Sequence, residues 1–182
     1  MSGTQTQTRS ARSSRLKTLL PRLVKGRFFI TDEPFESFRN VTQPAFGDKP
    51  EGLWYSCGDH WFRFLLTEAE SLPLKRYVYK LQINTEFVLR VKGAKAIDEF
   101  TQAHRVKFPL PNEVMWSVMS LRGWINWEQV ARAHAGVEIA PYCWSRRLSP
   151  HTQWYYGWDV ASGCLWDEKA FKKVTLLADL DE

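Results

Sequence analysis

The sequence lacks the short motifs that mark the common nucleotide-binding and hydrolytic enzymes. It has no Gly-x-Gly-x-x-Gly segment, no Walker phosphate loop, no His-Glu-x-x-His zinc motif and no Gly-x-Ser-x-Gly nucleophile motif. The four histidines do not have the spacing of metal ligands. They are His60, His104, His134 and His151. We therefore expect neither a conventional dinucleotide-binding fold nor a bound metal.

Cysteines and long apolar runs are also scarce. The three cysteines, Cys57, Cys143 and Cys164, are odd in number and widely spaced, which fits neither a disulfide framework nor a Cys-x-x-Cys metal site. Reduced thiols are typical of a cytoplasmic protein. No apolar run approaches the roughly 20 residues that a membrane helix needs, and the N-terminus lacks the apolar stretch of a secretory signal. These absences predict a cytoplasmic protein without a membrane partner.

Positive charge is concentrated at the N-terminus. Residues 1–25 contain six basic residues and no acidic one, whereas the whole chain has a net charge of only +5. The first 15 of these residues are mostly small and polar. We therefore predict a flexible, disordered basic arm over residues 1–25 and a single α+β domain over residues 26–182. Such an arm is either a solvated tail or a site for nucleic-acid phosphates.

Hydrophobic periodicity predicts strands and helices in irregular alternation, without the repeating βαβ pattern of a doubly wound sheet. This favours the α+β class. Helices are expected to start after Asp59 and after Asn126 and to cover 94–105. Strands are expected at 27–31, 52–56, 76–83, 87–91, 137–142, 154–160, 164–166 and 173–177.

Three segments combine aromatic and polar residues. In the first, residues 49–58, Trp54 and Tyr55 offer flat rings and Ser56 a hydroxyl, although a core strand explains them equally well. In the second, Glu138 and Tyr142 lie on one face of a predicted strand. Arg146 and Arg147 follow it, either as pyrophosphate ligands or as an exposed loop.

The third segment places Asp159 between Trp158 and Val160. A carboxylate in apolar surroundings needs a partner, because an unpaired buried charge is strongly unfavourable. Asp159 is therefore a candidate for transition-state stabilisation or general-base chemistry. The structural alternative is an aspartate that caps the turn at Ser162–Gly163.

Together, the segments KPEGLWYSCGDHW, GVEIAPYCWSRRL and WYYGWDVASGCLWD resemble ADP-ribosyltransferase-like proteins of phages and mobile elements, over roughly residues 27–170. The resemblance implies an ADP-ribosyltransferase-like split, mixed β-sheet with an NAD cleft between its halves. It also implies a transferase of the glycosyltransferase type, a mono-ADP-ribosyltransferase that uses NAD as a substrate and modifies a protein or nucleic-acid acceptor. The basic arm favours RNA or DNA, and a regulatory protein partner is also compatible.

The same resemblance implies roles for individual residues. Asp159 would stabilise the reacting ribose, with Glu138 as the alternative for this role, and Tyr55 would be the second catalytic residue. Arg27 would contact the phosphates or ribose of NAD, with Arg39 as the alternative. Asp159 stands where the superfamily usually has glutamate, and no Gln-x-Glu or Glu-x-Glu pair precedes it. The predicted NAD-binding residues are Arg27, Trp54, Tyr55, Ser56 and Tyr142.

Two other classes of function remain open from the sequence. One is a non-catalytic nucleic-acid-binding module that uses the basic arm for phosphates and exposed aromatic rings for bases. The other is a phage structural or assembly protein whose arm orders against its neighbours.

Overall fold

Seven strands in the described part of the chain form one hydrogen-bonded sheet, in the order β4-β5-β6-β2-β1-β3-β7. The computed structural model describes residues 2–106 and 124–182. Strands β4 and β5 are parallel and the other neighbouring pairs are antiparallel. The strands are β1 (Arg27–Thr31), β2 (Leu53–Cys57), β3 (Tyr77–Ile83), β4 (Val88–Val91), β5 (Gly136–Ile139), β6 (Ser162–Leu165) and β7 (Phe171–Asp179).

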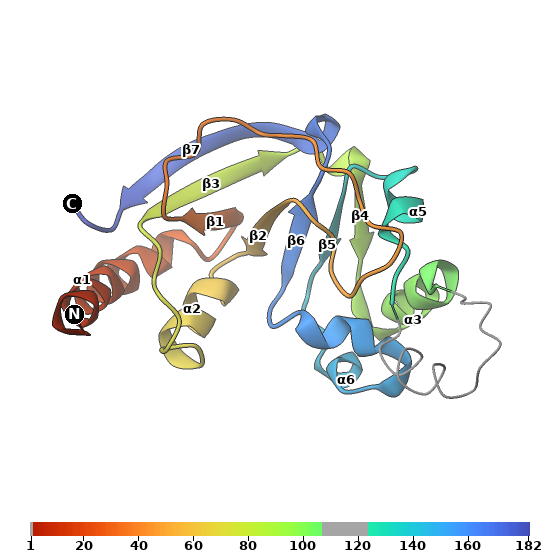
Figure 1. The fold of residues 1–182 in the computed structure, drawn as a ribbon, viewed down its shortest axis with the longest axis horizontal. Helices are drawn as coiled ribbons and strands as arrows, with labels where there is room; N and C mark the ends of the chain where they lie inside the picture. The colour runs from red at the N-terminus through yellow and green to blue at the C-terminus, as the bar shows by residue number, and fades with distance from the viewer. Residues whose placement is uncertain (1, 107–123) are drawn as a thin grey trace.

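The α+β class is confirmed, because this mixed sheet is combined with separate helices. The sheet is strongly curved and open (Figure 1). The resemblance implies a sheet that is split into two halves, but the observed sheet is not split. All seven strands belong to one hydrogen-bonded sheet, so its backbone is continuous. The division lies instead in the layer that covers one face of the sheet.

That layer consists of two groups of helices. The first group, α1 (Ser2–Leu19) and α2 (His60–Thr67), lies under the β1 and β3 end of the sheet (Figure 1). The second group packs around a tryptophan-rich cluster under the β5 and β6 end. It comprises α3 (Gly93–His104), α5 (Trp127–Ala131), α6 (Trp144–Arg147) and the 3-10 segment η4 (Pro150–Gly157), and shorter 3-10 turns lie at Leu20–Arg22, Thr85–Phe87 and Glu168–Ala170.

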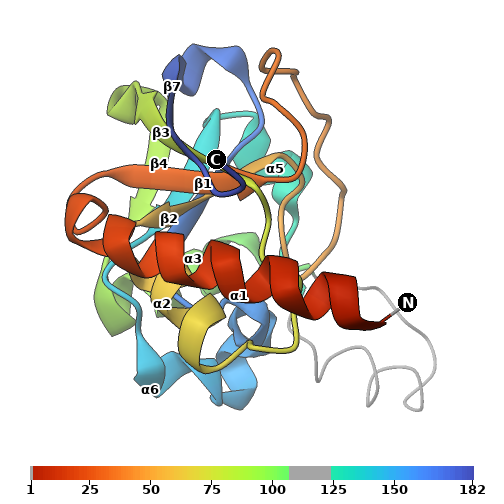
Figure 2. The same cartoon turned by 90° about the vertical axis from the view of Figure 1, so that its left-hand side faces the viewer.

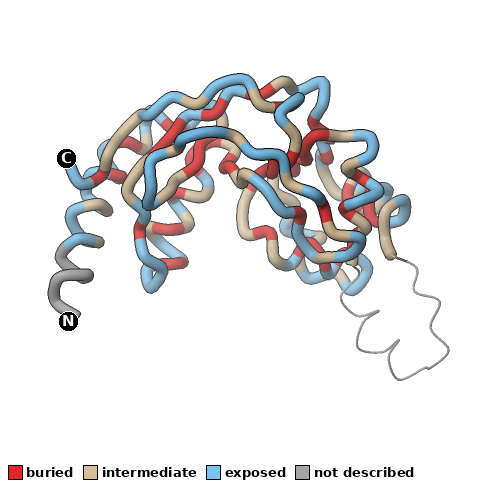
Figure 3. Tube along the Cα trace, turned by 45° about the horizontal axis from the view of Figure 1, so that its top comes forward, coloured by how far each residue is buried: buried red, intermediate tan, exposed pale blue. Residues whose placement is uncertain are grey.

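Alternation along the strands gives the two faces of the sheet separate cores. Phe28 and Val78 pack with α1 and α2. On the opposite face, Phe29 stacks on Tyr79 with their ring centroids 5.1 Å apart. The segment that joins β1 to β2 runs over this second face, and most of its residues are exposed (Figure 3). Phe38 holds the segment against the sheet, because its ring stacks on Phe171 at the start of β7 with ring centroids 5.1 Å apart.

The N-terminal segment is a helix and not the disordered arm that its composition predicts. In α1, Leu16 is fully buried, and Leu23 beyond its end is buried in the same cluster. The guanidinium of Arg12 donates to both carboxylate oxygens of Asp181, at 2.6 and 2.7 Å, and Arg15 donates to the carbonyl of Leu180. Figure 2 shows α1 lying alongside α2. The leucines supply apolar burial that compensates for the entropy of ordering a polar segment.

The predicted strand at 154–160 is also wrong, because residues Pro150–Gly157 form the 3-10 segment η4. Pro150 lies at the start of this segment, where its fixed φ is compatible with a helical turn. The predicted helix start at Asn126 is confirmed, since the Asn126 side chain accepts a hydrogen bond of 2.8 Å from the backbone N–H of Gln129.

The packing of α1 predicts a large effect for one truncated leucine. We expect Leu16→Ala to lower the free energy of unfolding by about 2–5 kcal/mol, because it leaves a cavity between α1 and the sheet. Lys17→Ala is the control, since Lys17 is exposed, and we expect it to change stability by less than about 0.5 kcal/mol. Urea unfolding of both variants measures the difference, and equal stabilities would show that α1 does not dock.

Candidate functional site

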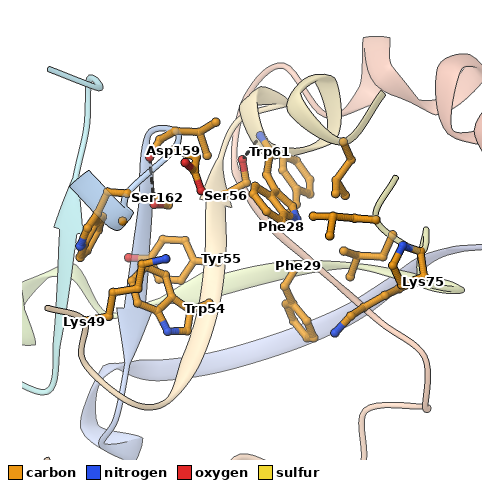
Figure 4. A pocket seen from close by; sticks show the side chains of 17 residues that line it. Phe28, Phe29, Lys49, Trp54, Tyr55, Ser56, Trp61, Lys75, Asp159 and Ser162 are labelled. Carbon is orange, nitrogen blue, oxygen red and sulfur yellow. Dashed lines mark hydrogen bonds between the residues drawn. The ribbon is translucent and has the colours of Figure 1, made fainter. Parts of the chain in front are cut away.

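A cavity of about 500 Å³ opens between the two groups of helices, against the β1 and β2 region of the sheet (Figure 4). It brings together Trp54, Ser56 and Asp159, three of the residues predicted from the sequence. The lining residues are Phe28, Phe29, Ile30, Lys49, Trp54, Tyr55, Ser56, Trp61, Leu65, Leu72, Pro73, Lys75, Gly157, Trp158, Asp159, Val160 and Ser162. The volume is in the range of small-molecule sites, about 300–1,000 Å³.

Three tryptophans, Trp54, Trp61 and Trp158, border the cavity. Trp54 on β2 contacts Trp158 edge-on, with ring centroids 4.8 Å apart. Trp61 lies in the first turn of α2 and stacks on Phe64 at 5.3 Å. These contacts hold each indole in place, so a flat ligand would meet rings that are already oriented.

Ser56 connects the strand to the helix that follows it. Its hydroxyl donates to the carbonyl of Gly58 at 2.8 Å and accepts from the backbone N–H of Trp61 at 3.1 Å. The side chain is buried. Ser56 therefore fixes the start of α2 and the position of Trp61, which is a positioning role in addition to its place in the cavity wall.

The charged groups of the cavity have both signs. Among the described residues that line it, Asp159 is the single acid and Lys49 and Lys75 are the bases. The carboxylate of Asp159 accepts a hydrogen bond of 3.0 Å from Arg147. The Lys49 ammonium lies 5.4 Å from the ring centroid of Trp54. The positive charge of Arg147 neutralises the negative charge of the Asp159 carboxylate. The charges of Lys49 and Lys75 therefore give the cavity a net positive charge.

Arg27, Tyr55 and Glu138 form a separate network directed to the opposite face of the sheet. The Arg27 guanidinium binds both carboxylate oxygens of Glu138, at 2.5 and 3.1 Å, and the Tyr55 hydroxyl donates to the same carboxylate at 3.2 Å. Arg90 adds a second cation at 3.4 Å. Because successive strand residues point to opposite faces, the Tyr55 ring is directed away from the side to which Trp54 and Ser56 point.

Gly163 allows this network to form. It lies on β6, directly opposite Tyr55 on β2 and Glu138 on β5. A Cβ atom at this position would collide with the Tyr55 hydroxyl and lie 2.6 Å from the carbonyl oxygen of Val137. Only glycine therefore lets the tyrosine side chain cross β6 and reach the carboxylate.

Ionisation in the network follows from burial and charge. Burial alone would raise the pKa of Glu138, but the hydrogen bonds and charge of Arg27, with help from Arg90 and Tyr55, hold that pKa below its ordinary value. Burial, reinforced by the charge of Glu138, raises the pKa values of Tyr55 and of the Cys57 thiol. At neutral pH the network thus contains a carboxylate, a neutral phenol and a neutral thiol, and Cys57 is a poor nucleophile.

The structure therefore divides the predicted site residues. Arg27 and Glu138 lie outside the cavity, and Arg39 is exposed in the segment between β1 and β2. Tyr55 borders the cavity, but its hydroxyl is bonded to Glu138. Tyr142 is absent from the cavity wall. It packs on Tyr155 with ring centroids 5.3 Å apart, and burial raises its pKa to about 12.

Sequence reasoning missed several residues of the cavity. Trp61 was detectable, since it follows the strand–turn pattern of residues 52–58 at the start of a predicted helix. Lys49 and Lys75 carry no local signal, because only the fold brings them to the cavity. Arg147 was proposed as a pyrophosphate ligand with Arg146, but the two pair with Asp159 and Asp98 respectively.

Comparison with known proteins gives no relative: no protein-family model, curated protein or solved structure matches this chain. Within the described residues there is no cluster of side chains suited to a metal ion, and no helix is long and apolar enough to cross a membrane. The fold and cavity define a class only, that of an open, mixed-sheet α+β protein with a ligand-sized cavity between two groups of helices.

The Glu138 network leads to a prediction about stability and pH. We expect Glu138→Gln to lower the free energy of unfolding at pH 7 by about 1–3 kcal/mol, because it leaves Arg27 without its countercharge. Since the folded state lowers the pKa of Glu138, its ionised form stabilises the protein above the ordinary value of about 4.5. This contribution disappears as the pH falls through the lowered value.

Urea unfolding at several pH values measures this effect, with Glu128→Gln as the control. Glu128 forms an exposed pair of 3.0 Å with Arg132, which is worth less than about 1 kcal/mol. If the stability difference between Glu138→Gln and wild type did not shrink in acid, the stabilising role of the ionised Glu138 carboxylate would be contradicted.

Proposed function

We propose that this chain is an NAD-dependent mono-ADP-ribosyltransferase acting on a macromolecular acceptor, and that the cavity between the helix groups binds NAD. The main support is the meeting of Trp54 and Asp159, which lie more than 100 residues apart in the sequence, on one cavity. Both residues belong to the segments that resemble ADP-ribosyltransferase-like proteins. The same cavity has the size and the charged groups that this substrate needs.

Each part of NAD has a complementary group in the cavity. The nicotinamide and adenine rings are flat and would pack against the indoles of Trp54 and Trp61. The diphosphate is an anion, and Lys49 and Lys75 are the cations on the cavity lining. Asp159 is the acceptor for a ribose hydroxyl.

Catalysis at this site would be mainly electrostatic. The bond between the ribose C1 carbon and the nicotinamide nitrogen breaks, and its electron pair leaves with nicotinamide. Positive charge develops on the ribose, and the carboxylate of Asp159 stabilises that charge. A nucleophilic atom of the acceptor then forms a bond to C1 and loses its proton to solvent. Water in the same position gives hydrolysis of NAD, which provides an assay without the natural acceptor.

Arg147 is the positioning residue for Asp159. Its guanidinium donates to the Asp159 carboxylate and lies 5.4 Å from the ring centroid of Trp144 and 5.3 Å from that of Tyr156. Contacts with both rings restrict the arginine, and the arginine restricts the carboxylate. A carboxylate held in one orientation stabilises a developing charge with little reorganisation.

The α1 contacts bear on the proposal of a binding module that uses a basic arm. Arg9 donates to the carbonyl of Leu65, Arg12 pairs with Asp181, and Arg15 binds the carbonyl of Leu180. These three cations are held within the molecule, so residues 1–25 present fewer free charges to phosphates than the sequence indicates.

Replacement of the cavity carboxylate tests the proposed chemistry. We expect the wild type to release nicotinamide from NAD, and Asp159→Asn to reduce the rate by about 100- to 1,000-fold, because the developing charge loses its counterion. Asp98→Asn is the matched control. Asp98 lies on α3 and pairs with Arg146, the neighbour of Arg147 in α6. Because Asp98 lies outside the cavity, this variant should keep the wild-type rate.

Equilibrium dialysis with labelled NAD separates binding from chemistry. Asp159→Asn should retain NAD binding while it loses turnover, because the rings and lysines remain. A wild-type chain that neither binds NAD nor releases nicotinamide, with protein, RNA and DNA present in turn, would refute the proposed function.

A second variant tests the role of Tyr55. We expect Tyr55→Phe to keep nicotinamide release close to the wild-type rate and to lower the free energy of unfolding by about 0.5–1.5 kcal/mol, because only the hydrogen bond to Glu138 is lost. Nicotinamide release and urea unfolding are measured on the same preparation. A large loss of rate with unchanged stability would return Tyr55 to a catalytic role.

A further inference from the structure

An exposed apolar patch lies beside the cavity. We call it the aromatic rim; it consists of Trp144 and Tyr156, whose rings both contact Arg147, and of Leu148, the residue that follows Arg147. Trp144 is 69% exposed, Leu148 79% and Tyr156 55%. Large apolar side chains gathered at this level of exposure are typical of interaction sites. None of the three side chains is buried in the core or lines the cavity, and Trp144 and Tyr156 act on the proposed NAD site only through their contacts with Arg147.

Arg147 orders the rim and links it to the cavity. Since its guanidinium carbon lies 5.4 and 5.3 Å from the ring centroids of Trp144 and Tyr156, the two rings are no more than about 11 Å apart. The same guanidinium binds Asp159, and Gly157, the residue after Tyr156, lines the cavity. A molecule on the rim is therefore next to the carboxylate at which the ribose would react.

We propose that the aromatic rim binds single-stranded nucleic acid by base stacking and presents it as the acceptor. The acceptor role rests on the proposed function, whereas the binding surface does not. Exposed tryptophan and tyrosine rings are usual partners of unpaired bases. Arg146 and Arg147 lie in this segment and no acidic residue occurs in the sequence between Glu138 and Asp159, but Asp98 and Asp159 pair with the two arginines. We therefore expect base stacking, more than charge attraction, to provide the binding.

The transfer to such an acceptor balances without a further reactant. A ring nitrogen or exocyclic amine of a base attached to the strand attacks the ribose C1 carbon of NAD and forms the new carbon–nitrogen bond. Nicotinamide leaves with the electron pair of the broken bond, and the attacking nitrogen loses a proton to solvent. A base stacked on the rim is held beside the cavity, which reduces the entropy lost in bringing the two reactants together.

Fluorescence anisotropy of a labelled 12-nucleotide DNA strand, measured on the full chain without NAD, tests the surface. We expect Trp144→Ala and Tyr156→Ala each to raise the Kd by about 5- to 100-fold, the usual range for loss of one stacked base. Phe87→Ala is the control, since it removes an exposed ring from the turn before β4 and should leave the Kd unchanged. Circular dichroism verifies that each variant is folded.

An abasic strand with the same number of phosphates distinguishes stacking from simple charge attraction. It should bind much more weakly than the strand with bases. Equal binding of the two strands, or no binding of either, overturns the proposal and leaves a protein as the occupant of the rim.

Nicotinamide release by the wild type is measured in parallel. Nicotinamide release without binding of DNA refutes nucleic-acid binding by the aromatic rim but not the proposed transferase activity. DNA binding that depends on Trp144, without any nicotinamide release, supports the rim as a binding surface and refutes the proposed transferase activity.

Discussion

The ion pair between Arg27 and Glu138 spans the middle of the sheet and stabilises one register of the strands between them. Arg27 lies on β1 and Glu138 on β5, with β2 and β6 between them. Tyr55 crosses this space and donates to the same carboxylate, which fixes the register of β2. Because side chains alternate along a strand, that register directs Trp54 to the other face, where the cavity lies.

The two faces consequently have different tasks. One contains a buried polar network whose charges are satisfied internally, and the other has a cavity whose lysines have the opposite charge to a diphosphate. α1 supports the cavity indirectly, since Arg9 binds the carbonyl of Leu65 and Arg12 that of Leu74, close to residues of the cavity wall. The N-terminal helix is therefore part of the folded unit, and its arginines stabilise the segment that closes one side of the site.

Several elements were predictable because their signals are local. The alternation in residues 77–83 and the asparagine cap at Asn126 both correspond to observed structure. Other elements were not predictable. Polar residues at the start of the chain favour disorder, and only the pocket for Leu16 makes that segment a helix. The strand expected at 154–160 is a 3-10 segment, because Trp154 and Trp158 pack into a cluster built by distant elements.

The sequence by itself determined the α+β class, most strands, and the presence of Trp54, Ser56 and Asp159 in segments that suggested a site. Tertiary structure alone decided which residues share it. Arg27, Tyr55 and Glu138 matched the expected pattern as well as Asp159 did, but strand register directs them to the opposite face. The physical reason is that local propensity fixes an element, whereas the side of the sheet that a residue occupies depends on pairing between strands far apart in the chain.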